Sequence, residues 1–437
     1  MTDNAKNIKP VHRIQKVAFD LEASSQQEAF AGQQKIKALF ESCIAPALEK
    51  AMDEHCPNGT IYKLDKLHVD LGKIDTENIN EKDLFLKFYN EIKKQLQYIH
   101  PGKIIKQTRQ EGALDIFVYF IKNGHFPWQC EYVKTAELEA AILSENKTLP
   151  EYFSKLFQAE NHRQRLANQF STLFIENIVL NILKEKNKDW LEKEKRRLSV
   201  YFNKKNALLI ILEAACKTTT KENFYLKTIA GHIDSNIGFY KKNKETKETR
   251  DAGFFKNKKE NTNKDNGPKE EKEIYADHAG IVLLHPFLGR FFDNIELLEN
   301  KVFKNEKSAE TAVHLLYFLA TGNTCPEEHE LPVFKMMCNW PLKKPIAKEV
   351  LLPENYTAKS EALLRAAIGH WDKLKNTSID GLREGFLQRK GKLEQQPEHW
   401  NLTVEHKTID ILMNSLPWSI SIVKLPWMKK MLRVNWA

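Results

Sequence analysis

The sequence has 437 residues, of which 42% are hydrophobic, 10% aromatic and 29% charged. This length predicts two or three domains, and the apolar content is sufficient for sizeable cores, so the composition excludes a wholly disordered chain. The net charge of +9 is spread along the chain instead of being gathered in one stretch, which argues against a nucleic-acid binder.

We expect a cytoplasmic protein without a membrane span. The six cysteines form no CxxC pair, so reduced thiols are the simplest interpretation. The first ten residues hold no apolar run of the kind found in a secretion signal. The longest apolar runs, such as residues 207–212, are too short to cross a bilayer.

Residues 1–110 predict a small N-terminal α+β module in the order strand, helix, strand, helix. Apolar and polar residues alternate over 16–22 and again over 66–71, which predicts two half-buried strands. Helices are expected over 26–55 and 81–98.

Capping residues support these boundaries. Ser24 or Ser25 offers an N-cap to the first helix, in which Pro46 predicts a kink, and Asn80 offers an N-cap to the second helix. Gly72 is expected to close the second strand.

The apolar spacing becomes helical over residues 111–240. One stripe leads to Gly124, which stands where a C-cap glycine belongs. Residues 207–216 predict a buried helix. One stripe consists of Leu114, Phe117, Val118 and Ile121, and a second consists of Leu166, Phe170, Leu173, Phe174 and Ile178.

Residues 241–273 are rich in Lys, Glu and Asn, and they cannot bury enough apolar surface to offset the entropy of ordering. They predict a flexible linker. Fully stretched, a segment of this length reaches about 110 Å, and as a random coil it spans about 30 Å on average.

Residues 274–437 predict a mainly helical C-terminal domain that ends in a small sheet. Residues 391–395 and 400–405 are expected to form a hairpin, and residues 420–425 a third strand. The fold class that we predict is therefore α+β, mostly helical.

One weak internal similarity, which we call the internal echo, relates a segment before the predicted linker to a segment after it. Residues 119–124 and 317–322 each predict the end of an apolar helix stopped by glycine. This pattern indicates either a duplicated helical unit or a chance match, because glycine commonly ends helices.

Motifs for catalysis or cofactor binding are absent, since the sequence contains no P-loop, Rossmann fingerprint, HExxH or GxSxG. Cys325, His329 and Cys338 match no common zinc spacing, so we interpret them as residues between helices. We predict no metal, cofactor or catalytic residue, and no enzymatic activity.

His370, Asp372, Ser378 and Asp380 lie close together in the sequence and include the residue types of a hydrolase triad. Sequence proximity does not build a triad. We expect Thr377 or Ser378 to cap a helix instead.

Tryptophan recurs beside proline at four places. The indole of such a pair either covers the end of an element inside the core or anchors a partner protein. We interpret most of these residues as core residues. Trp418, Trp427 and Trp128 are the candidates for partner binding.

An ordered set of segments resembles the tape measure proteins of contractile injection systems, which are phage-tail-like particles. The segments are HRIQKVAFDLE (12–22), LHVDLG (67–72), FIKNGHFPW (120–128), AGIVLLHPFL (279–288), AVHLLYFLATG (312–322), EHEL (328–331), residues 371–387, LPWSIS (416–421) and LPWM (425–428).

The resemblance implies a structural protein that sets tail-tube length and helps to assemble the baseplate and the inner tube. The partners that it implies are baseplate, spike-hub and inner-tube proteins, with this chain present in the assembled particle. The alternative is a transient chaperone or adaptor for a baseplate or effector protein.

Length limits the ruler role. At about 1.5 Å per helical residue, a ruler of about 1,000 Å needs on the order of 700 residues. The sequence therefore predicts a short measure, several copies, or a factor that acts at one end of the tube.

Overall fold

The computed structural model describes residues 11–20, 25–55, 60–72, 80–98, 104–144, 152–183, 188–217 and 273–436. The predicted linker therefore lies outside the described residues, except for Glu273. The chain forms two compact units. Unit 1 comprises residues 1–115 and 140–145, and unit 2 comprises residues 116–139 and 146–437.

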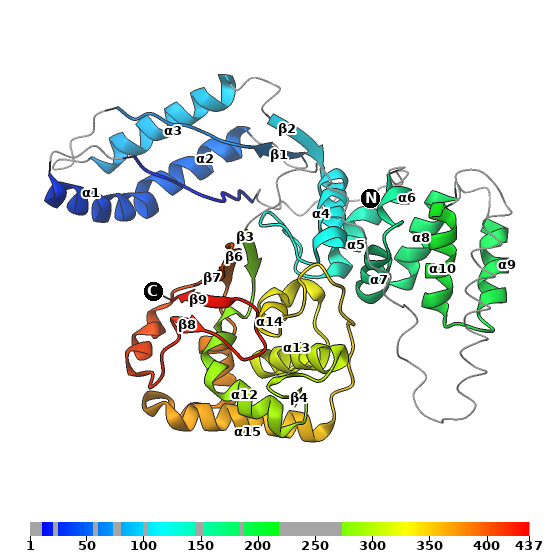
Figure 1. The fold of residues 1–437 in the computed structure, drawn as a ribbon. Coiled ribbons are helices and arrows are strands. Elements are labelled where there is room, and N and C mark those ends of the chain that lie inside the picture. The colour runs from blue at the N-terminus through cyan, green and yellow to red at the C-terminus, as the bar shows by residue number, and fades with distance from the viewer. Residues whose placement is uncertain are drawn as a thin grey trace. The chain divides into compact units, whose positions relative to one another are not determined.

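Unit 1 is a small α+β unit (Figure 1). Its elements are α1 (Gln26–Leu39), η1 (Phe40–Ile44), α2 (Ala45–His55), β1 (Thr60–Leu64), α3 (Glu81–Tyr98), β2 (Ile104–Thr108) and the first half of α4 (Arg109–Asn123). Strands β1 and β2 pair antiparallel, with Thr60 opposite Thr108.

The predicted helix over 26–55 is confirmed, as is its cap, because the Ser25 hydroxyl accepts a hydrogen bond from the Glu28 N–H. The π-helical turn η1 ends at Ile44, two residues before Pro46, and the Ala45 N–H donates to the Phe40 carbonyl. Proline has no N–H to continue the α-helical hydrogen bonds. The backbone hydrogen bonds of the helix are therefore rearranged just before Pro46.

The predicted strands over 16–22 and 66–71 are wrong. Residues 16–20 and 66–71 belong to no strand, while residues 21 and 22 lie outside the described residues. Leu67, Val69 and Leu71 pack instead against the core between α2 and α3. Alternating apolar and polar residues indicate an extended chain with one buried face. In residues 66–71 that face packs against helices and the chain pairs with no strand.

Unit 2 begins with a helical region. Its elements are the second half of α4, α5 (Thr135–Leu143, whose end belongs to unit 1), α6 (Phe153–Leu156), α7 (Glu160–Gln169), α8 (Thr172–Ile182), α9 (Lys188–Leu198) and α10 (Lys204–Lys217). Helix α10 contacts α6, α7, α8 and α9, and its residues 207–216 are all buried, as predicted. Phe117 of α4 packs against the rings of Phe153, Phe170 and Phe174.

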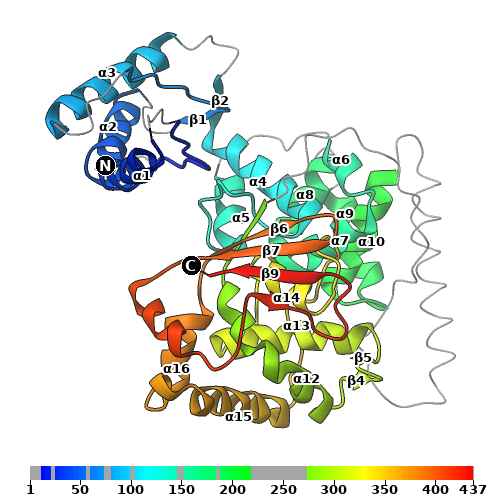
Figure 2. The same cartoon turned by 60° about the vertical axis from the view of Figure 1, so that its left-hand side comes forward.

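The rest of unit 2 is a helical layer against a five-stranded sheet (Figure 2). Its first elements are β3 (Glu273–Ala276), η4 (Ala279–Leu284), α12 (His285–Asn294), β4 (Leu298–Glu299), β5 (Val302–Phe303), α13 (Glu306–Thr321), η5 (Glu328–Glu330), α14 (Pro332–Met337) and α15 (Glu354–His370). They are followed by η6 (Asp372–Leu374), α16 (Ile379–Leu382), η7 (Arg383–Leu387), β6 (Gly391–Gln395), β7 (His399–Val404), η8 (Thr408–Ser415), β8 (Ile422–Val423) and β9 (Met431–Asn435).

The sheet has the order β3-β6-β7-β9-β8, in which only β7 and β9 run parallel. The predicted hairpin is β6 and β7, with Gly391 opposite Val404, and the predicted third strand contains β8. Strands β3 and β9 were not predicted. The α+β, mostly helical class is confirmed.

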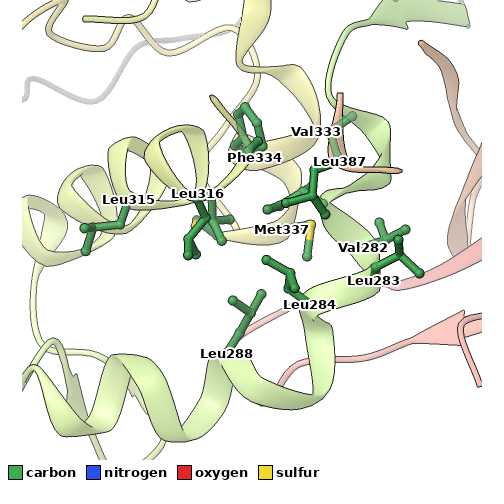
Figure 3. Close-up of a cluster of buried hydrophobic side chains, with 14 of the residues drawn as sticks. Val282, Leu283, Leu284, Leu288, Leu315, Leu316, Val333, Phe334, Met337 and Leu387 are labelled. Atoms are coloured by element: carbon green, nitrogen blue, oxygen red, sulfur yellow. The ribbon is translucent and has the colours of Figure 1, made fainter. Parts of the chain in front are cut away.

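The core of this part lies between the sheet and helices α12 to α15 (Figure 3). Side chains from η4, α12, α13, α14 and η7 meet there. The labelled residues are Val282, Leu283, Leu284, Leu288, Leu315, Leu316, Val333, Phe334, Met337 and Leu387. Elements approach closely here, since a Cβ on Gly280 would lie 1.7 Å from the Phe386 carbonyl oxygen.

Candidate interaction sites

Trp427 lies inside unit 2. Its side chain is 5% exposed, and its Nε1–H donates to the Met337 carbonyl at 2.8 Å. Its ring packs against Phe292 and Phe303 with centroid distances of 5.5 and 5.0 Å. The indole in this conformation therefore stabilises the core.

Trp418 is half-buried and follows the exposed residue Pro417. Its Nε1–H donates to the Leu283 carbonyl at 3.0 Å, and its ring meets Phe287 edge-on at 5.2 Å. Trp128 is also half-buried. Of the three candidates, Trp418 and Trp128 are the two residues that are partly exposed.

Three charged side chains meet in the interior of unit 2. Arg165 of α7 and Glu328 of η5 form a two-pronged ion pair, with Nε–Oε2 at 3.0 Å and Nη2–Oε1 at 3.1 Å. The Nζ of Lys335, from α14, lies 2.6 Å from Glu328 Oε1. The side chains of Arg165 and Glu328 are fully buried, and that of Lys335 is 1% exposed. We call these residues the ion cluster.

The ion cluster joins the helical region of unit 2 to the part that contains the sheet. Arg165 also donates to the carbonyls of Ile121 and Lys343. Further bonds cross the same boundary. They are Asn168 Nδ2 to the Ile346 carbonyl (2.9 Å), the Glu328 N–H to Gln169 Oε1 (3.0 Å) and the Thr135 N–H to Glu327 Oε2 (2.7 Å).

The ion cluster has an excess of buried positive charge, because two cations share one carboxylate. Burial lowers the pKa of the Lys335 ammonium, and Glu328 opposes that change. Burial also lowers the pKa of the nearby His125 to about 4, with Lys335, Arg165 and Lys343 adding to the effect. Removal of the Glu328 carboxylate would leave two buried cations without their shared partner.

The two glycines of the internal echo have the same geometry. Gly124 and Gly322 end α4 and α13 with φ of 80° and 79°. An arginine side chain donates to the carbonyl three residues before each glycine, Arg165 to Ile121 and Arg383 to Leu319. The positive φ is ordinary helix C-cap geometry, whereas the shared arginine contact is an observation that a duplicated helical unit would explain.

The cysteine and histidine candidates for a metal site do not converge. Cys338 is buried and Cys325 is exposed, while His329 stacks on Phe126 at 4.2 Å and faces Glu327. Across the described ranges, no group of three potential ligands is placed to hold a metal ion.

The residues of the triad pattern have other partners. The Ser378 hydroxyl accepts a hydrogen bond from the Gly381 N–H and caps α16, as predicted. Asp372 pairs with Lys375 at 2.6 Å. His370 is the last residue of α15 and lies beside Phe287.

A family model described as contractile injection system tape measure protein matches residues 11–436. This chain belongs to that family. No curated protein and no solved structure matched it. Within the described residues of this tape measure protein, no helix is long and apolar enough to span a membrane.

The family segments contain part of what holds the tape measure protein together. Glu328 stands in the EHEL segment, and Gly124 in FIKNGHFPW. Sequence reasoning did not single out Arg165 or Lys335, because a charged residue within a helix is usually a solvent-facing residue. Two signals were available, since Arg165 directly precedes the apolar stripe that begins at Leu166, and Lys335 stands inside the apolar run 331–338.

Proposed function

We propose that this tape measure protein acts as an assembly factor at one end of the tube and remains in the assembled particle, where it contacts baseplate and inner-tube proteins. On this proposal it has no catalytic role. Its docking surfaces include the exposed edges of Trp418 and Trp128.

The observation that carries the proposal is the position of the two chain ends that flank residues 218–272. Lys217 ends α10 and Glu273 begins β3, and both belong to unit 2. The ion cluster and its neighbouring hydrogen bonds hold the two parts of unit 2 together. The separation between these ends is therefore independent of how many residues lie between them.

The length of the chain also supports an assembly factor over a ruler. Since a helix rises about 1.5 Å per residue, compact units of this size are far shorter than a tube of about 1,000 Å. Length control by this chain would then act through the number of copies or through initiation, and not through the contour length of one chain.

Particle length provides the test. We would insert about 30 residues of matched composition within 241–272, delete a similar number as the matched control, and remove the whole chain in a third strain. We expect unchanged tube lengths in electron micrographs for the first two strains and loss of intact particles for the third. Tubes that lengthen with the insertion and shorten with the deletion would reject the proposal in favour of a ruler.

Composition of purified particles tests the second part of the proposal. We expect quantitative mass spectrometry to find this chain in a fixed ratio to the baseplate proteins. Its absence from mature particles, together with loss of particles on deletion, would favour the transient chaperone or adaptor.

A further inference from the structure

The N-terminal segment of unit 1 is extended along a helix. The His12 Nε2 lies 2.7 Å from Asp53 Oδ1, and the ring of Phe19 meets that of Phe40 at 6.0 Å. Asp53 and Phe40 stand thirteen residues apart along α2 and η1, which is about 20 Å of helix. Seven residues in an extended conformation reach about 23 Å, at about 3.3 Å each, which matches that distance.

This extended segment has no strand partner. Residues 16–20 belong to no strand, and no backbone hydrogen bond joins them to another described residue. Their backbone therefore offers N–H and C=O groups to a further strand, as the edge of a sheet does.

The segment also exposes large apolar side chains. Val11 is 67% exposed, Ile14 44%, Val17 43% and Phe19 40%. Phe30 of α1 is 62% exposed. A concentration of exposed apolar residues in one short segment is typical of an interaction surface.

Residues 16–20 are complementary to themselves in antiparallel orientation. Their order is Lys, Val, Ala, Phe, Asp. If two copies align with Ala18 opposite Ala18, Lys16 of each copy faces Asp20 of the other, and Val17 faces Phe19. Opposite charges and aromatic to β-branched contacts are the favourable cross-strand pairs, and this register contains two of each.

Net charge permits such an association. Residues 1–115 contain as many lysines and arginines as aspartates and glutamates, so the excess positive charge lies in the rest of the chain. A neutral region does not repel its own copy.

We propose that residues 16–20 pair antiparallel with the same residues of a second copy of this chain, around a two-fold axis at Ala18, to form a dimer. The interface is isologous, because each copy contributes the same surface. Strand pairing explains why a sequence with strand alternation is unpaired in the single chain.

Charge exchange in the full-length chain tests the proposal. Lys16 and Asp20 are both exposed, so substitution does not disturb a core. We expect Lys16→Glu alone, or Asp20→Lys alone, to weaken dimerisation by about tenfold in sedimentation velocity, because two favourable pairs become like-charge pairs. Lys37→Glu makes the same change of charge at an exposed position on α1 and is expected to leave dimerisation unaltered.

Rescue identifies the register. An equimolar mixture of the Lys16→Glu and Asp20→Lys chains places opposite charges together again and is expected to restore dimers. The variant that carries both substitutions in one chain should dimerise like the wild type. A wild-type chain that stays monomeric across the micromolar range overturns the proposal, as does a mixture that fails to recover.

A cysteine at the two-fold axis gives a second readout. In a background with Cys56, Cys130 and Cys325 replaced by serine, Ala18→Cys should form a disulfide-linked dimer on mild oxidation, because directly opposed Cα atoms lie about 4.5–5.5 Å apart. Gln15→Cys is the matched control, since its copy would lie about 20 Å away in this register. Equal cross-linking of both variants contradicts the register.

Discussion

Unit 1 and unit 2 differ in how their buried and exposed apolar side chains are arranged. The described core cluster of unit 1 consists of Ile44, Ala47, Ala51, Phe88 and Ile92. Unit 2 has a continuous core that runs from β3 to β9, and a buried ion cluster in addition. Unit 1 gathers several exposed apolar side chains in residues 11–19, which fits the strand pairing proposed above, whereas the exposed apolar residues of unit 2, such as Leu173, Val200 and Leu351, are far apart in the sequence.

The largest change in stability is expected when the carboxylate of the ion cluster is removed. Glu328→Ala leaves Arg165 and Lys335 buried without their acceptor, so we expect unit 2 to lose about 3–5 kcal/mol of unfolding free energy. Urea unfolding, with hydrogen exchange to separate peptides of the two units, provides the measurement.

Glu361→Ala removes an exposed pair with Arg365, which is worth only about 0.3–0.5 kcal/mol, and serves as the control. A loss below about 1 kcal/mol for Glu328→Ala would show that the ion cluster does not hold unit 2 together.

A pair of glycines compares the units directly. Gly124→Ala in unit 2 combines a positive φ with a new Cβ 2.7 Å from Glu328 Oε1, and we expect a loss of about 3 kcal/mol. Gly72→Ala in unit 1 has a φ of 61° and open space around its Cβ, so strain alone costs about 1 kcal/mol. Equal losses in thermal or urea unfolding would mean that unit 2 relaxes around the added methyl group.

Acidification should weaken unit 2. Burial lowers the pKa of His125 and of His314 to about 4 each, against about 6.5 in the unfolded chain. The neutral histidines therefore contribute their full stability above about pH 6.5, and this contribution is lost as the pH falls toward 4. At pH 5 the loss is about 2 kcal/mol for each histidine.

Urea unfolding at pH 7 and pH 5 measures this dependence. The variant His125→Asn should show a smaller difference between the two pH values than the wild type. An identical difference would argue that His125 does not remain neutral in the folded state.

The smallest expected effect concerns the helix caps. Ser25 caps α1 in unit 1, and Ser378 caps α16 in unit 2. Either serine replaced by alanine should cost about 1 kcal/mol. Particle assembly should survive Ser378→Ala, and abolished assembly in a stably folded variant would reopen a functional role for that hydroxyl.

Local features could be predicted from the sequence. Ser25, Asn80, Gly124 and Ser378 each cap or end a helix as expected, because a cap depends on residues within one turn. The hairpin of β6 and β7 was predicted for the same reason, since its strands are close in sequence.

Contacts between distant residues could not be predicted. Strand β9 pairs in parallel with β7, and β3 pairs with β6 across more than a hundred residues. Arg165 and Glu328 are buried only because they meet, and each by itself is typical of a helix surface. The strand pattern over 16–22 failed for a related reason, because alternation does not say what covers the apolar face.

The placement of Lys217 and Glu273 in one compact unit also bears on how the chain tolerates breakage. A backbone cut between them would give an N-terminal and a C-terminal fragment that still bind each other through Arg165, Glu328 and their carbonyl partners. The cut protein would then behave as a non-covalent complementation pair. We therefore expect unit 2 to stay assembled when a tag or a reporter domain is inserted between Lys217 and Glu273.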